Sequence, residues 1–262
     1  MSLKISQSMM KTYTDYLNKQ ECGLVFEAKY ITHTYESKPT KAMAEGIYFE
    51  YLATGALPRT GEVPVPLRDA KGSLTADYQR ITEAAKFFKE IISHHGIIIK
   101  KVGLSVSTDD MTGITDIFAS WEDRDVVIDT KYSGLLDDKW NNLGWEIESL
   151  PMKDSLMIPG VHYKLLFREA KGIENIPFYY FVFNSKDPRD MKIIEQVVDE
   201  DSFEAHKKIV MKVKASVMHE IDRGFKAYPE YRRCVKCQLF EKCEKRQQYP
   251  EPTQVHYTLT AI

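Results

Sequence analysis

Two stretches of sequence decide the predicted fold, GITDIFASW at residues 113–121 and VVIDTKYSG at residues 126–134. Both are rich in β-branched and aromatic residues, and the turn-forming residues between them are typical of a hairpin. Together with the β-rich run at residues 97–106, they predict a three-stranded meander. The apolar run at residues 126–128 indicates a central strand buried on both faces. A carboxylate directly after such a strand, at Asp129, is unexpected unless it has a functional role.

The register of this hairpin decides which side chains meet. If the turn is centred on Asp123 and Arg124, Asp116 lies opposite Lys131, and side-chain alternation puts Asp129 on the same face as both. Two carboxylates and an ammonium group then lie within about 8 Å of one another. The expectation depends on the turn, because a one-residue slip in pairing moves every side chain to the other face.

This group of charges indicates a metal site. Two close carboxylates cannot both stay ionised at low cost without a cation, and their hard oxygens suit Mg²⁺ or Mn²⁺. A neighbouring lysine would stabilise a developing phosphorane or help to deprotonate a water, as metal-assisted phosphodiester hydrolysis requires. The alternative is a solvated strand face whose Asp and Lys form a weak surface ion pair.

The rest of the chain predicts an α/β fold without internal repeats. Apolar spacing and capping residues place helices at 6–18, 41–55, 74–95, 155–170 and 201–227, strands at 177–184 and 191–198, and a loop at 56–73. Glu50 lies on the second helix, about 60° from Ile47 and so beside its apolar stripe. The alternative for Glu50 is a solvent-facing helix glutamate.

The four cysteines indicate a second site. Cys234, Cys237 and Cys243 form C-x2-C-x5-C, and Cys22 stands alone near the other end of the chain. In a reducing compartment, four thiolates could close one site for an iron–sulfur cluster or structural zinc and join the chain ends. The alternative is that Cys22 is a small buried apolar residue and that the other three are coincidental or a partial site.

Composition limits the class of protein. The 262 residues are 43% hydrophobic and 28% charged, without a run of about 18 apolar residues or the layout of a secretion signal. We therefore expect a cytoplasmic protein with no membrane partner. The net charge of −2 excludes a generally basic polyanion binder but not a local basic patch.

Such a patch is predicted at residues 204–246, which hold twelve Lys and Arg against six Asp and Glu. This basic segment predicts phosphate contacts with a steep salt dependence, although a charge-rich helix is commonly a solvated face. The residues expected to contact DNA are Arg232, Arg233, Lys236 and Lys242. Tyr228, Tyr231 and Phe240 are candidates for stacking on single-stranded bases.

These motifs resemble the PD-(D/E)xK nuclease superfamily, in the RecB-like exonuclease branch that carries a four-cysteine iron–sulfur cluster. Glu50 in GIYFEYLATG, Asp116 in GITDIF and Asp129-Thr130-Lys131 in VVIDTKYSG occur in the family's order. The cysteine pattern is similar to that of AddB-type and CRISPR-associated exonucleases. The resemblance covers nearly the whole chain and implies a restriction-endonuclease-like mixed sheet flanked by helices. It also implies one domain over residues 1–246, with its ends joined by the cysteines, and a tail at 247–262.

The resemblance implies a role for each matched position. Glu50, Asp116, Asp129 and the carbonyl of Thr130 would bind the catalytic Mg²⁺ or Mn²⁺, and Lys131 would position or activate the attacking water. The four cysteines would hold a 4Fe–4S cluster, with structural Zn²⁺ as the alternative.

One family motif is altered. In the Q-x3-Y motif of RecB-like nucleases, Tyr163 matches the catalytic tyrosine, but Pro159 stands where the glutamine would be. Pro159 and Gly160 are expected to begin this helix later than usual. His162 and Lys164 then remain available for phosphate contacts.

The implied function is metal-dependent exonucleolytic cleavage of DNA in end processing, recombination or repair, of the phage or mobile-element type. CRISPR spacer acquisition is a narrower possibility. The expected partners are DNA with a free end or a single strand and a recombination or annealing protein; no G-x4-G-K-[ST] motor motif is present. The alternative is a catalytically idle nuclease fold that binds DNA or a recombination partner through the basic segment.

Overall fold

The computed structural model describes residues 3–35, 39–58, 61–133, 140–141, 144–145 and 154–249. The chain forms two compact units. Unit 1 comprises Met1–Met10 and Pro39–Ser216, and unit 2 comprises Lys11–Lys38 and Val217–Ile262. No helix in the described ranges is long and apolar enough to cross a membrane. The predicted single domain over residues 1–246 and the cytoplasmic location stay predictions.

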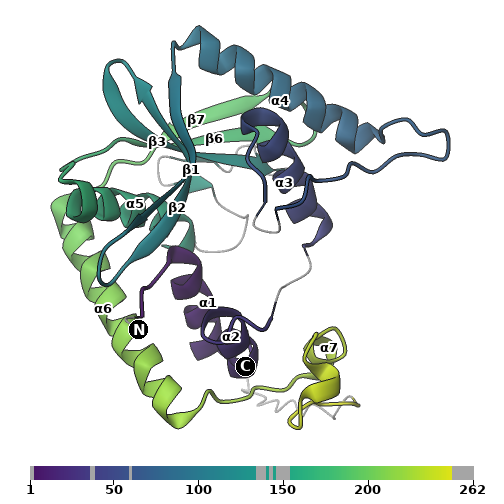
Figure 1. Ribbon diagram of the computed structural model, residues 1–262, viewed down its shortest axis with the longest axis vertical. Coiled ribbons are helices and arrows are strands. Elements are labelled where there is room, and N and C mark those ends of the chain that lie inside the picture. The colour runs from purple at the N-terminus through teal and green to yellow at the C-terminus, as the bar shows by residue number, and fades with distance from the viewer. Residues whose placement is uncertain are drawn as a thin grey trace, which may run out of the picture. The chain divides into compact units, whose positions relative to one another are not determined.

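Unit 1 contains a mixed five-stranded sheet with the order β1-β2-β3-β6-β7 (Figure 1). The strands are β1 (Ile98–Ser107), β2 (Thr112–Trp121), β3 (Arg124–Ser133), β6 (Phe178–Asn184) and β7 (Met191–Glu195). β3 and β6 are parallel and the other neighbours antiparallel. A parallel pair needs a crossover connection, which helix α5 (Asp154–Lys171) supplies. The predicted α/β fold with a mixed central sheet and flanking helices is confirmed.

The β2–β3 hairpin has a different register from the expected one. Its two-residue turn is Glu122-Asp123, both with positive φ, and Trp121 pairs with Arg124. Such a turn matches the twist of the two strands, so the turn is centred one residue earlier than expected. The pairing therefore shifts by two positions, which keeps every side chain on its predicted face.

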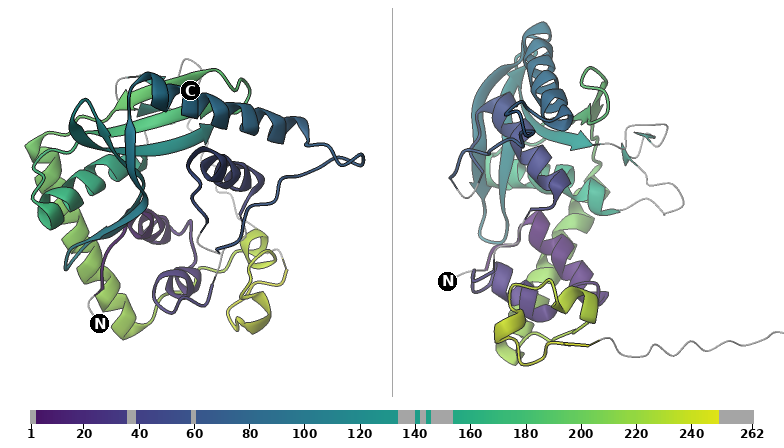
Figure 2. Two further views of the ribbon diagram at one scale, coloured as in Figure 1. Left: turned by 45° about the horizontal axis from the view of Figure 1, so that its top comes forward. Right: turned by 90° about the vertical axis from the view of Figure 1, so that its right-hand side faces the viewer.

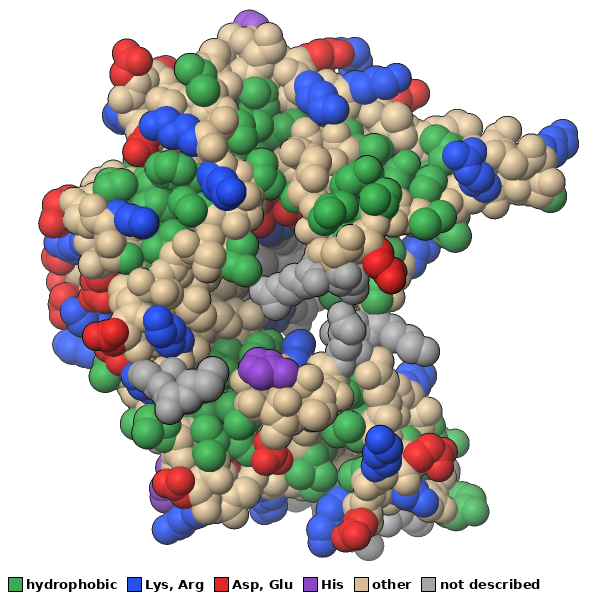
Figure 3. Space-filling model, in the orientation of Figure 1, with side chains coloured by type: hydrophobic (Ala, Val, Ile, Leu, Met, Phe, Trp, Pro, Cys, Tyr) green, Lys and Arg blue, Asp and Glu red, His purple; other side chains and the backbone are tan. Residues whose placement is uncertain are grey.

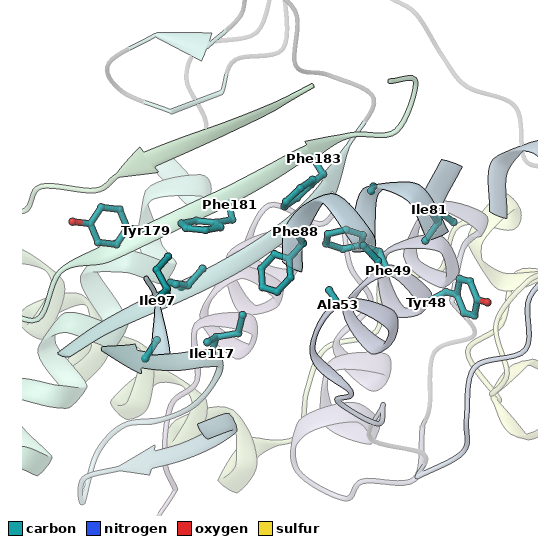
Figure 4. Close-up of a cluster of buried hydrophobic side chains, with 14 of the residues drawn as sticks. Tyr48, Phe49, Ala53, Ile81, Phe88, Ile97, Ile117, Tyr179, Phe181 and Phe183 are labelled. Carbon is teal, nitrogen blue, oxygen red and sulfur yellow. The ribbon is translucent and has the colours of Figure 1, made fainter. Parts of the chain in front are cut away.

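One face of the sheet is covered by α3 (Lys41–Thr54) and α4 (Ala76–His94). The Thr40 side chain accepts a hydrogen bond from the backbone N–H of Met43 and caps α3, and Gly55 ends it in the left-handed conformation at φ 78°. Figure 4 shows the core between these helices and the sheet. Its side chains include Phe49 and Ala53 from α3, Ile81 and Phe88 from α4, Ile117 from β2, and Phe181 and Phe183 from β6.

The other face is covered by α5, against which the N-terminal part of α6 (Glu200–Arg223) packs (Figure 2). The expectation that Pro159 begins α5 is wrong, because the helix starts at Asp154 and Pro159 lies within its second turn. A proline there removes one hydrogen bond but does not end the helix. α6 stops at Arg223 instead of residue 227, because Gly224 adopts φ 85° and its N–H bonds Glu220. A small hairpin of β4 (Trp140–Asn141) and β5 (Gly144–Trp145) completes unit 1.

Unit 2 is built on aromatic side chains. It contains α2 (Gly23–Tyr30), which periodicity did not predict, α7 (Tyr231–Cys234) and the 3₁₀ turn η1 (Phe240–Lys242), while α1 (Gln7–Leu17) has residues in both units. The ring of Phe26 is fully buried and lies 5.1–5.3 Å from those of Tyr13, Tyr30 and Phe225. Such contacts between large rings give a small unit much of its apolar burial.

Candidate active site and cysteine site

Asp116 marks the point where β2 and β3 stop pairing. The last pair of the ladder is Ile117 with Ile128, so the register carries Asp116 to a place opposite Asp129 rather than opposite Lys131 as expected. The Asp116 Oδ2 atom accepts the backbone N–H of Thr130 at 2.8 Å and its hydroxyl at 3.4 Å. A side-chain carboxylate thus takes the place of a backbone acceptor and is fixed beside β3.

Asp129 and Lys131 lie on the same face of β3, as side-chain alternation predicts. Asp129 is only 6% exposed, and its Oδ2 forms an ion pair with Lys131 Nζ. The Lys131 side chain is 36% exposed, so part of it reaches solvent while its partner is buried. A weak surface ion pair, the alternative prediction, requires both groups to be in solvent. Asp129 is buried, so this pair is not of that kind.

Glu50 approaches the same group from α3. It is half-buried near the C-terminal end of that helix, and its charge interacts with those of Asp116, Lys131 and Asp129. The structure therefore brings together the four residues predicted to act in catalysis through their charges. Their assigned roles stay predictions.

Burial and neighbouring charges raise the pKa of two carboxyl groups of the site, Glu50 and Asp129. Burial raises the pKa of Glu50 to about 7, and the Asp116 charge adds to the effect, against the attraction of Lys131. Burial likewise raises the pKa of Asp129 to about 7, with Lys131 opposing and Asp116 contributing. Burial lowers the pKa of Lys131, but the neighbouring carboxylates, Asp129 first, more than offset this, so the net shift is upward.

The donor chemistry at this site fits a hard divalent cation. In the described ranges, no three His, Cys, Asp or Glu side chains are placed to hold one metal ion as they stand. Apart from the ion pair with Lys131, however, the buried Asp129 Oδ2 has no hydrogen-bond partner among the described residues. Oxygen-only donors of this kind are those that Mg²⁺ and Mn²⁺ prefer, and a cation would offset the burial and the neighbouring negative charge that raise the pKa of Glu50 and of Asp129.

His162 and Lys164 of α5 are placed differently from the expectation that they are available for phosphate contacts, and the catalytic role of Tyr163 between them stays a prediction. His162 is fully buried and Lys164 is 3% exposed, so neither is available for a phosphate, and that expectation is wrong. Tyr163 is 6% exposed, and its hydroxyl donates to the carbonyl of Ile114 at 2.5 Å. All three point inward because this stretch of α5 lies between the sheet and α6.

A residue that the motifs did not indicate borders the site. Tyr180 pairs with Asp129 in the parallel β3–β6 ladder, is 4% exposed, and donates its hydroxyl to Gln196 Oε1 at 3.4 Å. The Gln196 side chain packs so close to Gly160 that a Cβ there would lie 2.0 Å from Oε1. A tyrosine inside the wholly buried strand FYYFVFN was a signal, because a buried hydroxyl needs a partner.

All four cysteines line one cavity in unit 2. The cavity measures about 440 Å³, and each of the cysteines is half-buried and free of disulfides. Burial raises the pKa of Cys237; a backbone hydrogen bond from Leu239 opposes this, and the charges of Cys22, Cys234 and Cys243 raise the pKa further. The sequence prediction that Cys22 joins the C-terminal trio therefore has a geometric basis.

A close backbone contact puts Cys22 beside the other three. The N–H of Gly23 donates to the carbonyl of Lys226 at 3.2 Å, and the N–H of Lys226 donates to the hydroxyl of Tyr16, also at 3.2 Å. A Cβ at position 23 would lie 2.3 Å from the Lys226 oxygen, so only glycine permits this approach.

Four thiol groups around one cavity are the ligand chemistry of both an iron–sulfur cluster and structural zinc. Among the described residues, no three cysteines are placed to hold one ion as they stand. Both occupants therefore stay predictions.

The predicted DNA-binding residues differ in availability. Arg232, Lys236 and Lys242 are exposed, with no ion pair to any described residue. Arg233 is half-buried and engaged with Glu230, with the carbonyl of Lys19 at 3.1 Å and with that of Tyr228 at 3.4 Å. Basic side chains mix with acidic ones at the lower right of Figure 3, around α7. The exposed three are therefore better placed for phosphates than Arg233.

Comparison with known proteins gives the fold and no family. No family model matches the chain, and no curated protein matches it. It is similar to the crystal structure of a protein from Eubacterium rectale called a "putative exonuclease", with a TM-score of 0.64, 15% identity, and coverage of 96% of this chain and 91% of that one. At that identity the likeness shows the fold alone, an α/β fold with a mixed central sheet. A second match, to the crystal structure of SSO0001, has a TM-score of only 0.32 and 12% identity, over 91% of this chain and 98% of that one.

Proposed function

We propose that this protein is a Mg²⁺- or Mn²⁺-dependent deoxyribonuclease of the PD-(D/E)xK type, in the RecB-like branch, that digests DNA from an end. The observation that carries the proposal is that Asp116, Asp129 and Lys131 meet on one face of the sheet and that the charge of Glu50, from α3, interacts with all three. All four side chains are half-buried or buried. A nuclease-like fold supports it. The proposed role is DNA end processing, recombination or repair, of the phage or mobile-element type.

Each residue of the site has a distinct task in this proposal. Asp116, Asp129, Glu50 and the Thr130 carbonyl would hold the metal, which supplies charge stabilisation and a more acidic bound water. Lys131 would stabilise the charge that develops on the scissile phosphate or help to deprotonate the attacking water.

The proposal gives unit 2 a cluster and a DNA surface. Cys22, Cys234, Cys237 and Cys243 would hold a 4Fe–4S cluster, with structural Zn²⁺ as the alternative. Arg232, Lys236 and Lys242 would contact phosphates of single-stranded or end-bearing DNA, and a recombination or annealing protein is the proposed partner. Free thiolates require the reducing conditions of the cytoplasm.

Digestion of labelled linear DNA tests the activity. Wild-type protein should release nucleotides from linear DNA with Mn²⁺ or Mg²⁺ and leave a covalently closed circle of the same sequence intact. Cutting of both forms would keep the nuclease and overturn the end requirement. DNA binding without cutting of either form would support the catalytically idle binder instead.

Anaerobic purification tests the cluster. The expected protein is brown, absorbs in the thiolate-to-iron charge-transfer region and contains about four iron atoms per chain. A colourless protein with one zinc per chain would establish the alternative. Cys237→Ser should lose the metal in either case, and Thr32→Ser, a matched substitution on the same unit, should keep it.

A further inference from the structure

Among the described residues, no strand covers one edge of the N-terminal half of β2. Within the described residues, β2 pairs with β1 over most of its length but with β3 only from Ile117 onward. The backbone groups before Ile117 on the side away from β1 therefore need other partners, because an unpaired buried carbonyl or N–H is costly. Asp116 stands at the end of this uncovered half.

Side chains of α5 supply the missing partners. His162 Nε2 lies 3.0 Å from the carbonyl of Thr112, and the Tyr163 hydroxyl lies 2.5 Å from the carbonyl of Ile114. The N–H of Thr112 donates to the carbonyl of Ile5 at 3.0 Å. Carbonyls two residues apart on a strand point to the same edge, so α5 holds β2 at two successive points directly before Asp116.

The glycine between these points makes the contact possible. A Cβ at Gly113 would lie 2.7 Å from Cε1 of Tyr163 and 3.0 Å from a methyl carbon of Leu166. Its absence lets the Tyr163 ring lie against the strand, where the ring also stacks on Phe178 at 5.9 Å. The helix thus reaches the strand closely enough for both hydrogen bonds.

A second histidine fixes the proton on His162. A carbonyl oxygen only accepts, so His162 Nε2 must carry the hydrogen that goes to Thr112, which leaves Nδ1 as an acceptor in the neutral ring. His206 of α6 places its Nε2 3.1 Å from that Nδ1 and must donate to it. Both rings are almost fully buried, at 0% and 5% exposure, where a hydrogen bond is strong and its loss expensive.

We infer that His162, with its tautomer set by His206, and Tyr163 are positioning residues that hold the uncovered half of β2 and so keep the Asp116 carboxylate on the Thr130 amide. In this arrangement α5 supports the proposed nuclease site from the face of the sheet opposite α3. It rests on the proposed function only for its effect on catalysis, because the Asp116–Thr130 bond exists whatever the protein does.

Amide hydrogen exchange of Thr130, followed by NMR, tests the inference without any nuclease assay. His162→Leu should speed exchange at Thr130 by roughly tenfold or more, because the released strand no longer holds Asp116 in place. His162→Gln, which keeps a donor near the Thr112 carbonyl, should restore most of the protection. The amide of Phe181 in the sheet centre and the exposed-site variant His94→Leu serve as controls and should show no change.

Tyr163→Phe removes one hydroxyl and keeps the ring, so it provides a test even if His162→Leu fails to fold. It should speed Thr130 exchange less than His162→Leu does, but measurably. Folded His162→Leu or Tyr163→Phe protein with wild-type exchange at Thr130 would overturn the inference. Nitrogen-15 spectra should also show both histidines as neutral Nε2–H tautomers near neutral pH, and an Nδ1–H tautomer at His162 would overturn it as well.

The same variants connect the inference to the proposed activity. If the wild type cuts DNA, His162→Leu should lower the single-turnover rate by roughly 10- to 100-fold with little change in KM for DNA. A wild type that cuts nothing would end the proposed function, while the exchange result would still decide the role of His162.

Discussion

The carboxylate site of unit 1 and the cysteine site of unit 2 are assembled in different ways. Asp116, Asp129 and Lys131 lie on two strands, and their meeting depends on strand register and burial. The cysteines come from two short segments that one close contact at Gly23 brings together. In unit 1 the fold buries carboxyl groups close to one another, and the pKa values of Glu50 and Asp129 rise. In unit 2 the same backbone contact that holds the two segments together also places Cys22 beside the other cysteines. Substitutions should therefore spare folding at the carboxylates and disturb it at the cysteines.

The largest expected effect is on catalysis, from Asp129→Asn. Loss of this buried ligand should lower the rate of Mn²⁺-dependent DNA cleavage by roughly a hundred- to a thousandfold, with folding retained. Asp125→Asn on the same strand is the matched control, since Asp125 pairs with Lys100 away from the site. Equal rates for the two variants in a single-turnover assay would remove Asp129 from the active site.

Gly23→Ala should disrupt the cysteine site. The added methyl group would overlap the Lys226 carbonyl, which lies on backbone and cannot move aside cheaply. We expect a loss of about 2–3 kcal/mol in the free energy of unfolding and most of the bound metal. Gly46→Ala in α3, where a Cβ would meet nothing within 4 Å, should cost no stability. Full metal content in Gly23→Ala, measured by elemental analysis, would show that the contact does not build the site.

The pH dependence of stability should reveal the raised pKa of Glu50. Because Glu50 has a folded-state pKa of about 7 against 4.5 ordinarily, the folded protein holds a proton that the unfolded chain releases between about pH 4 and 7. Stability without metal should thus fall through this window as pH rises, by about 3 kcal/mol from Glu50.

Chemical denaturation of Glu50→Gln against wild type measures this contribution. The variant should be the more stable of the two at pH 8 and lose that advantage near pH 4, while Glu83→Gln on the exposed side of α4 should follow the wild type. Mn²⁺ should stabilise the wild type more at pH 8 than at pH 5. A Glu50→Gln advantage that grows toward low pH would contradict the account.

The smallest expected effect is on DNA affinity. Lys236→Gln should reduce the slope of log affinity against log salt by about one and weaken binding to all sequences equally. Lys86→Gln, an exposed lysine of α4, is the control. An unchanged salt slope for single-stranded DNA in Lys236→Gln would remove this residue from the DNA surface.

The sequence predicted the sheet, its flanking helices and which charged residues and cysteines lie near one another, because strand alternation and cysteine spacing are local signals. It missed the hairpin register, because Glu122-Asp123 adopts a turn that its composition does not single out. It missed α2, an eight-residue helix without a distinct polar face, which aromatic packing stabilises. It also failed to predict the burial of His162, because that side chain is buried by β2 and α6, which meet α5 only in the folded chain.

The most direct test of the central claim, that these carboxylates and Lys131 form a metal-dependent hydrolytic centre, is single-turnover digestion of end-labelled linear DNA by the wild type with Mn²⁺. We predict nucleotide release from the ends that stops on chelation of the metal and disappears in Asp116→Asn and Lys131→Ala. Undiminished cleavage by either folded variant, or DNA binding without any cleavage by the wild type, would contradict the claim.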